Sequence, residues 1–195
     1  MKYIISRYSQ DIIPHPFEDD TIVYDRSPYP LEDSIKVPNI GSDIYDKLTF
    51  IIDNYNNLPD VAIYTKHNLF KYITPEEFEV VKYNKTFTPL FTMKHKTYMP
   101  TCYYSEGMYY EKNDKWYLGS HPTKTHETAD ELMELLGIKD MEYIPFAPGS
   151  NYILPKANIL KHPKDLYIKL RSYLDWSIYP GEAQIMERGL YTLWS

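Results

Sequence analysis

Hydrophobic and polar positions alternate most clearly between residues 37 and 65, where they predict a loop, an amphipathic helix, a turn and a buried strand. One face of the predicted helix, over residues 41–55, carries hydrophobic side chains at helical spacing: Ile44, Leu48, Ile51, Ile52 and Tyr55. A turn that contains Pro59 ends this helix, and residues 61–65 form a short apolar run typical of a strand. In α/β folds ligands bind beyond the carboxyl ends of such strands, which draws attention to the polar residues that follow Thr65.

The remaining pattern predicts a single α/β domain over residues 1–195, with a mixed, mostly parallel sheet flanked by helices. Strands are expected at residues 3–6, 21–25, 61–65 and 151–154, and closing helices at 163–176 and 181–194. Two sequences have the form of a helix-starting capping box, at residues 74–77 and 128–131, and Gly137 is a plausible helix stop. Residues 86–118 are aromatic and alternating, which predicts an inserted β-hairpin with its turn at residues 112–114.

The last predicted helix carries two carboxylates at the border of its apolar stripe. That stripe is formed by Ala183, Met186, Leu190, Leu193 and Trp194. Glu187 falls on one flank, Glu182 on the opposite flank, and Arg188 is expected to point further toward solvent. A partly desolvated carboxylate holds a proton more tightly and suits a general base. The alternative is that Glu187 is an ordinary boundary residue, paired with Lys or Arg of a neighbouring element.

Charged residues also follow the predicted strands. Lys66 could neutralise a diphosphate and His67 could hydrogen-bond to it, although an ordinary polar loop fits the same pattern. If the first two strands are parallel neighbours, Arg7, Asp25 and Arg26 converge on one rim, where they could recognise a phosphate and a ribose. A surface ion-pair cluster is the competing interpretation of these three residues.

Composition narrows the choice of function class. The net charge of −6 argues against a general nucleic-acid binder, because phosphate contacts need clustered Lys and Arg. The 21 tyrosines offer flat apolar faces that suit sugars or bases, although a biased composition would also produce them. The single cysteine, Cys102, excludes an internal disulfide and fits a reducing compartment. Without an apolar run long enough for a membrane span, or a signal-peptide core, we expect a cytoplasmic protein with no membrane insertion.

Metal ligation is poorly supported by the sequence. His121, His126 and Glu127 are close together, but they lie in a Pro/Thr-rich loop without a helix to fix their spacing. The chain also has no Gly-rich phosphate loop, nucleophile elbow or paired-cysteine motif. We therefore expect no resident metal site.

Several segments resemble an uncharacterised family associated with glycosyltransferases. They read YIISRYSQD from Tyr3, TIVYDRS from Thr21, NYNNLPD from Asn54 and FAPGSNYILPKANILKHP from Phe146, followed by a late Glu-Arg pair. Members of that family tend to have an Arg-Tyr-Asn-Glu-Asp-like string, an Asn-x-Gly-Arg-Glu motif, an Asn-Tyr-x-x-Leu-Pro-Asp turn and a closing Glu-Arg pair. The resemblance covers both ends of the chain, while residues 86–128 match none of these motifs.

The resemblance implies a nucleotide-sugar transferase domain of the single-domain A type (GT-A-like). Carried over by position, the donor-binding residues would include Arg7, Tyr8, Asp11, Asn39, Gly41 and Asp43. Glu187 and Arg188 would stand at the catalytic centre, with Glu182 as a further acidic candidate on the same helix.

This chain departs from the family pattern at places that bear on the mechanism. Gln10 replaces the usual Glu, Ser42-Asp43 replaces Arg-Glu, and Lys66-His67-Asn68 stands where A-type transferases carry a metal-binding Asp-x-Asp pair. We therefore predict that a divalent metal is not needed, and that Lys66 and Arg188 together stabilise the charge of the departing diphosphate.

The sequence thus favours a glycosyltransferase that moves a sugar from a nucleoside-diphosphate sugar to an acceptor hydroxyl. The acceptor, a glycan, a protein, a small molecule or a modified nucleic-acid base, stays open. Aromatic residues of the inserted segment are candidates for an acceptor platform: Tyr103, Tyr104, Tyr109, Tyr110 and Trp116. The main alternative is a non-catalytic sugar- or nucleotide-binding domain of the same fold, and a weaker one is a scaffold protein.

Overall fold

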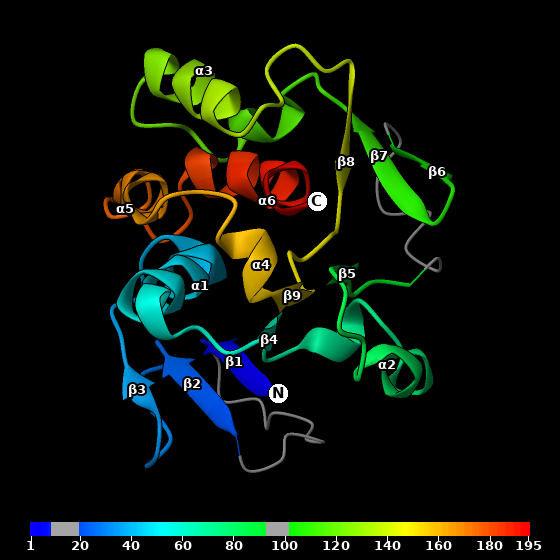
Figure 1. Cartoon of the computed structure of the whole chain (residues 1–195). Coiled ribbons are helices and arrows are strands. Elements are labelled where there is room, and N and C mark those ends of the chain that lie inside the picture. The colour runs from blue at the N-terminus through cyan, green and yellow to red at the C-terminus, as the bar shows by residue number, and fades with distance from the viewer. Residues whose placement is uncertain (9–19, 93–101) are drawn as a thin grey trace.

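The larger sheet of the described residues has six strands in the order β3-β2-β1-β4-β9-β5 and lies in the lower half of Figure 1. The structure is a computed structural model that describes residues 1–8, 20–92 and 102–195. The strands of this sheet are β1 (Lys2–Arg7), β2 (Thr21–Asp25), β3 (Ile35–Lys36), β4 (Val61–Lys66), β5 (Thr88–Pro89) and β9 (Tyr152–Pro155). The pairs β1–β2, β2–β3 and β1–β4 are parallel, while β9 is antiparallel to both of its neighbours. The predicted mixed, mostly parallel sheet is therefore confirmed.

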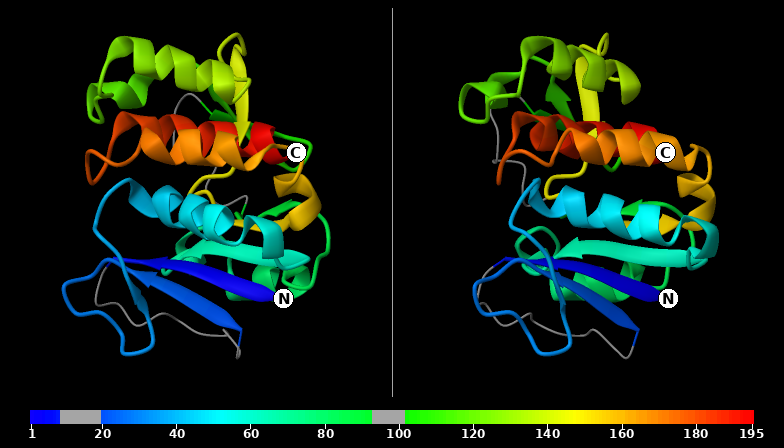
Figure 2. Two further views of the ribbon diagram at one scale, coloured as in Figure 1. Left: turned by 60° about the vertical axis from the view of Figure 1, so that its left-hand side comes forward. Right: turned by 90° about the vertical axis from the view of Figure 1, so that its left-hand side faces the viewer.

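Helices cover both faces of this sheet. They are α1 (Ser42–Asp53), α2 (Pro75–Val81), α3 (His126–Leu135), α4 (Lys156–Ile159), α5 (Lys164–Ser172) and α6 (Gly181–Trp194). Short 3₁₀ turns are η1 (Tyr55–Asn57), η2 (Leu69–Lys71) and η4 (Trp116–Gly119). Figure 2 shows α1 lying on one face of the sheet, α5 and α6 above α1, and α3 outermost. On the opposite face, Phe78 of α2 packs in one cluster with Ile5 and Ile63 of the sheet.

The hydrophobic core is divided by the sheet. The larger cluster lies on the α1 side and includes the predicted apolar face of α1, with Leu48 and Ile51 fully buried, and the stripe of α6 that ends at Trp194. The smaller cluster lies on the α2 side, around Phe78 and Ile63. Because both faces of the central strands are buried, these strands read as continuous apolar runs.

The aromatic segment forms a second, three-stranded sheet, and here the sequence prediction needs correction. Its strands are β6 (Cys102–Ser105), β7 (Met108–Lys112) and β8 (Tyr143–Phe146), in the order β6-β7-β8. The hairpin turn lies at Glu106 and Gly107, both with positive φ, and not at residues 112–114. Gly107 supplies the left-handed conformation that such a turn requires. The predicted second hairpin strand, after Asp114, is the 3₁₀ turn η4 instead.

One predicted helix start and one predicted helix stop are confirmed, and the other predicted helix start is wrong. Thr74 and Glu77 form the predicted reciprocal capping box at the start of α2, and Gly137, with a φ of 70°, follows the end of α3. The start of α3 was misplaced, because Thr125 caps this helix by accepting a hydrogen bond from the Thr128 N–H. Thr128 therefore lies inside the first turn. In the described part of the chain, none of the helices combines the length and the apolar character that a membrane span needs.

The sheet order places one position where a ligand is expected. In the sheet, β2 lies beside β1 and β3 lies beyond β2, whereas the next strand, β4, lies on the opposite side of β1. The order in which strands are added to the sheet therefore reverses between β1 and β4. In open α/β sheets ligands bind at such a reversal, beyond the carboxyl ends of the strands. Arg7 and Lys66 end the two strands there, and α1 begins close by, since the Ser6 hydroxyl donates to the Asp43 carbonyl.

Candidate functional site

A small polar pocket lies at this point, with a volume of about 60 Å³. Its lining residues come from the ends of β1, β2 and β4, the start of α1 and the loop before α6: Tyr8, Arg26, Asn39, Ser42, Asp43, Lys66 and Tyr179. The register of the sheet brings these segments together, because Arg7 pairs with Asp25 and Ser6 pairs with Lys66. Five of the predicted donor-binding residues therefore meet in one pocket.

A buried ionic cluster forms the floor of this pocket. Asp43 is 4% exposed, and its carboxylate binds Lys47 through Oδ2 while Oδ1 lies 3.3 Å from Lys66 Nζ. Burial on its own would raise the pKa of Asp43, but the two ammonium groups hold this pKa well below its usual range. Asp43 is therefore ionised at neutral pH and positions the two lysines.

The two lysines differ in their access to the pocket. Lys47 is 1% exposed and also lies 3.1 Å from Ser150 Oγ, and burial lowers its pKa below the usual value despite Asp43. Lys66 reaches the pocket surface and lies 5.6 Å from the centre of the Tyr72 ring. Burial would lower the pKa of Lys66, but Asp43 and Glu187 raise it above the usual value. Lys66 is thus the charged lysine available to a ligand.

Glu187 approaches the same cluster from α6. Its Oε1 accepts a hydrogen bond of 2.6 Å from the Gly149 N–H, and its charge acts on both Lys47 and Lys66. Gly149 has a φ of 83°, and a side chain there would meet the Tyr72 ring at 2.6 Å. Glu187 therefore fixes the loop between β8 and β9 against the cluster. It does not line the pocket itself.

Arg7 and Asp25 converge as predicted, but they form a buried ion pair with each other and are not available to a ligand. Arg7 Nη1 lies 2.6 Å from Asp25 Oδ2 and 2.7 Å from Ser27 Oγ, and both residues of the pair are buried. Burial would raise the pKa of Asp25, but hydrogen bonds from the Ser27 and Leu31 N–H groups and from Arg7 lower it below its usual value. This pair holds the loop after β2, and neither of its residues lines the pocket.

Arg26 does line the pocket, and it is held in place from two sides. Its Nη2 donates to Asp46 Oδ1 at 2.5 Å and its Nη1 donates to the Ile40 carbonyl at 2.8 Å. The guanidinium therefore connects β2 to α1 and to the Asn39 loop. Its edge contributes positive charge to the same pocket as Lys66.

Tyr8 and His67 form a pair at the rim. The two rings meet edge to face at 4.7 Å, with His67 2% exposed beneath and Tyr8 40% exposed at the pocket. His67 thus supports Tyr8 and is not itself a pocket-lining residue. Asp11, predicted near the donor, lies outside the described residues.

Gly41 contributes through its backbone. Its φ is 67°, and an added Cβ would lie 2.8 Å from the Leu174 Cβ and 2.9 Å from the Leu174 carbonyl oxygen. Only glycine combines that conformation with so close an approach. Gly41 therefore sets how Asn39 and Ser42, on either side of it, reach the pocket.

Two of the predicted catalytic residues lie elsewhere. Arg188 was expected near solvent and beside Lys66, but it is 2% exposed and binds both oxygens of Glu111 on β7, with Nη2 to Oε1 at 3.2 Å. Its guanidinium carbon lies 3.9 Å from the centre of the Tyr117 ring. Arg188 thus joins α6 to the second sheet, and the predicted pairing of Arg188 with Lys66 at a diphosphate is wrong.

Glu182 is also structural. It is fully buried, and its Oε1 accepts a hydrogen bond of 2.8 Å from the Lys124 N–H. The neighbouring Gly181 N–H donates to the Pro122 carbonyl at 3.0 Å. Glu182 therefore anchors the loop before α3 to the start of α6, away from the pocket.

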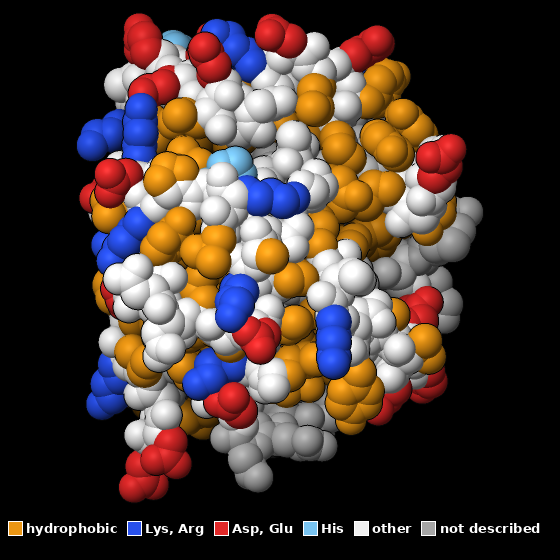
Figure 3. Space-filling view, in the orientation of Figure 1, with side chains coloured by type: hydrophobic (Ala, Val, Ile, Leu, Met, Phe, Trp, Pro, Cys, Tyr) orange, Lys and Arg blue, Asp and Glu red, His pale blue; other side chains and the backbone are white. Residues whose placement is uncertain are grey.

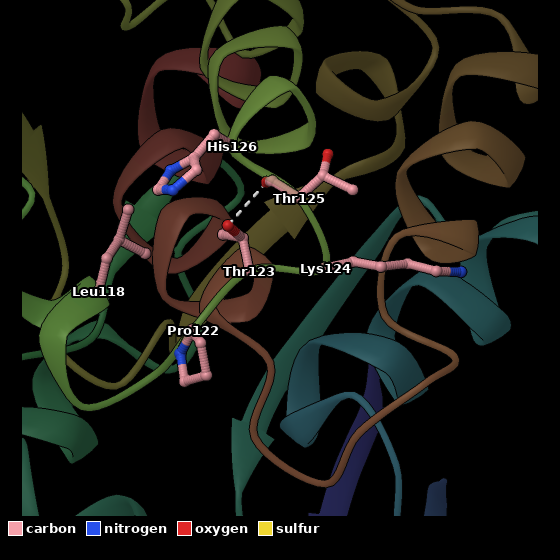
Figure 4. Close-up of a pocket in the computed structure, with 6 residues that line it drawn as sticks. All are labelled: Leu118, Pro122, Thr123, Lys124, Thr125 and His126. Carbon is pink, nitrogen blue, oxygen red and sulfur yellow. Dashed lines mark hydrogen bonds between the residues drawn. The ribbon is translucent and has the colours of Figure 1, made fainter.

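That loop borders a second hollow, with a volume of about 270 Å³ (Figure 4). Leu118 and His126 lie on one side of it, the Lys124 side chain extends away from them, and Thr123 Oγ1 donates to the Thr125 carbonyl at 2.8 Å. None of the predicted site residues lines this hollow. Among the described residues, no group of three or more His, Cys, Asp or Glu side chains is arranged to hold a metal ion.

Lys47, Ser150 and Tyr179 belong to the site but were not among the residues predicted from the sequence. Lys47 had a usable signal, because it follows Asp43 by four residues on the predicted helix, the spacing of a same-face ion pair. Ser150 and Tyr179 lie in loops far along the chain, and only the tertiary structure brings them to α1. Over the face shown in Figure 3, Lys and Arg side chains of the described residues are interspersed with Asp and Glu, so this face carries no basic nucleic-acid stripe.

Comparisons with protein-family models, with curated proteins and with solved structures find no match for this chain.

Proposed function

We propose that this protein is a glycosyltransferase whose pocket at the ends of β1, β2 and β4 binds a nucleoside-diphosphate sugar. The observation that carries the proposal is that Lys66 and Arg26 both line a pocket at the reversal point of a mostly parallel sheet. Positive side chains at that position suit a phosphorylated ligand. The sequence resemblance to an A-type transferase family supports the same ligand class.

The proposed reaction is a transfer of the sugar to an acceptor hydroxyl. The acceptor oxygen forms a bond to the anomeric carbon, the bond from that carbon to the diphosphate oxygen breaks, and the diphosphate leaves with the electron pair. Glu187 accepts the proton of the acceptor hydroxyl. Lys66 and Arg26 stabilise the charge on the diphosphate, which in this proposal needs no divalent cation. Arg26 therefore has the role that was predicted for Arg188.

A non-catalytic binding domain is the second candidate, and a specific observation favours it. Each positive group at the pocket already has a carboxylate partner, since Arg26 binds Asp46 and Lys66 lies beside Asp43. One oxygen of Glu187 also accepts the Gly149 N–H. A protein arranged in this way can hold a ligand without turning it over.

Donor binding is the first test. Nucleoside diphosphates and their sugars should raise the melting temperature, because a ligand that binds only the folded state stabilises it. Lys66→Met should weaken binding about tenfold or more, in the range expected for a lost charge-assisted hydrogen bond. Lys85→Met is the matched control, since Lys85 is exposed and lies outside the pocket. If none of the nucleotides binds the wild-type protein, the proposal is wrong.

The Glu187→Gln variant separates the two candidates. The glutamine oxygen can still accept the Gly149 N–H, so the loop and donor binding should be retained. A transferase should lose about 100-fold or more in turnover when its general base is removed, whether the assay follows transfer to an acceptor or hydrolysis of the donor. A wild-type protein that binds donor and turns over none of it would identify the binding domain. Loss of activity in EDTA would contradict the metal-free form of the mechanism.

A further inference from the structure

Tyr179 is an aromatic residue of the pocket to which the proposed reaction assigns no role. It lies in the loop between α5 and α6, lines the pocket and is 51% exposed. In the part of the chain that the structure describes, its ring makes no ring contact and its hydroxyl makes no hydrogen bond. A large aromatic side chain left half exposed beside a polar pocket is available to a ligand.

The backbone around Tyr179 is nevertheless fixed. The Gly41 N–H donates to the Ser177 carbonyl at 2.8 Å, and the Ser42 N–H donates to the Ile178 carbonyl at 3.1 Å. Pro180 follows immediately as the N-cap residue of α6. The ring is thus attached to a backbone that is bonded to the start of α1, which lowers the entropy cost of using it for binding.

The groups that share the pocket with Tyr179 indicate what kind of ligand it contacts. Lys66 and Arg26 bring positive charge, and Tyr8 brings a second exposed aromatic ring, 40% exposed. Flat apolar rings next to cations suit a molecule that has both a planar ring and an anionic group. A nucleotide has that combination, with a base that stacks and phosphates that bind cations.

Exposure alone does not distinguish Tyr179 from other surface tyrosines. Tyr83 is 67% exposed, but its ring lies 4.9 Å from the Lys82 ammonium and it does not line the pocket. Tyr179 differs in its position beside Lys66 and Arg26 and in the anchoring of its backbone to α1. Tyr83 is therefore a suitable control residue.

We propose that Tyr179 stacks on the nucleobase of the bound nucleotide and supplies the part of the affinity that depends on the base. This inference rests on the proposed function, because it assumes that the pocket binds a nucleotide. It adds a residue from the α5–α6 loop that no sequence motif indicated.

The test compares dissociation constants measured by calorimetry. The probes are UDP, GDP, ADP, CDP and dTDP, together with inorganic pyrophosphate as a competitor that has no base. Tyr179→Ala should raise the dissociation constant of the tightest nucleotide about 5-fold to 150-fold, the range measured when a stacking aromatic side chain is replaced by alanine. Tyr179→Phe should stay within about threefold of the wild type, because the ring is kept. Tyr83→Ala should leave the constant unchanged.

The outcomes separate the inference from the proposed function. If Tyr179→Ala is folded, as shown by an unchanged melting temperature, and binds the nucleotide as tightly as the wild type, the stacking inference is overturned. It is also overturned if the variant loses affinity for pyrophosphate as much as for the nucleotide, since the effect then does not depend on the base. If the wild-type protein binds none of the five nucleotides, the proposed function fails and the inference fails with it.

Discussion

Asp43 and Lys66 lie 3.3 Å apart, Oδ1 to Nζ, and join the first turn of α1 to the end of β4. The other oxygen of the same carboxylate binds Lys47, one helical turn further along α1. Ser150 also donates to this oxygen at 3.1 Å, which brings in the loop before β9. One carboxylate therefore holds three segments in the arrangement that forms the pocket.

Replacing this carboxylate should destabilise the protein strongly. Asp43→Asn leaves Lys47 buried without its counter-ion, and loss of one partner from a buried pair costs about 3–5 kcal/mol. The double variant Asp43→Asn with Lys47→Met should recover part of that loss, because the unpaired charge is removed as well. Urea unfolding measures both free energies.

Asp60→Asn is the matched control for this experiment. Asp60 pairs with Lys156 on the surface, with its side chain 88% exposed, so its replacement should change the free energy of unfolding far less. Equal effects of Asp43→Asn and Asp60→Asn would contradict the interpretation of Asp43 as a structural centre.

Acid should weaken the fold through the same residue. The pKa of Asp43 is lower in the folded protein than in the unfolded chain, so the unfolded chain takes up the proton first as the pH falls. The stability that Asp43 contributes is present above its unfolded pKa, near 4, and is lost progressively below it. We expect the free energy of unfolding of the wild type to fall between about pH 5 and pH 3, and the fall to be shallower in Asp43→Asn. An identical slope in the two proteins would show that other carboxylates carry the acid sensitivity.

The pattern of hydrophobic residues predicted the sheet and most helices because local spacing determines which face is buried. The α6 boundaries, 181–194, agree with the prediction, and so does the apolar face of α1. The aromatic segment was harder to interpret, because β7 pairs on both sides and its partner β8 lies 31 residues further along the chain at the Lys112–Tyr143 pair. A local alternation cannot reveal such a partner.

From the hydrophobic pattern alone, the candidate site was predictable only where its residues end strands, while Asn39 and Asp43 were predicted from the family resemblance. Lys66 and Arg26 follow apolar runs, and their convergence follows from parallel pairing. Arg188 shows the opposite case. Helical geometry placed it toward solvent, but a second sheet that the sequence did not reveal covers that side of α6 and supplies Glu111 as its partner. The orientation of a side chain on a helix determines its environment only when the neighbouring elements are known.

The pair formed by Arg188 and Glu111 gives the third prediction. Arg188→Met leaves Glu111, which is 1% exposed, without its counter-ion and should cost about 3–5 kcal/mol in the free energy of unfolding. Adding Glu111→Leu should recover much of this loss, because two apolar groups can replace a buried ion pair. In urea unfolding the double variant should therefore be more stable than Arg188→Met alone. If Arg188→Met instead keeps wild-type stability and loses nucleotide binding, Arg188 acts at the ligand site and not as a structural residue.

Two glycines allow the last prediction to separate backbone conformation from close packing. Gly41 and Gly107 both have positive φ, 67° and 82°, but an added Cβ at Gly107 would meet only the Tyr104 hydroxyl, at 4.0 Å. Gly107→Ala should therefore lower the free energy of unfolding only by the cost of a left-handed backbone conformation, about 1 kcal/mol. At Gly41 the Cβ would also lie 2.8 Å from the Leu174 Cβ and 2.9 Å from its carbonyl oxygen, so the chain must move, and Gly41→Ala should cost about 2–4 kcal/mol. Because that movement shifts Asn39 and Ser42 at the pocket, Gly41→Ala should also weaken nucleotide binding, while Gly107→Ala should not. Equal losses of stability in the two variants would mean that the contact with Leu174 relaxes freely and does not constrain the pocket wall.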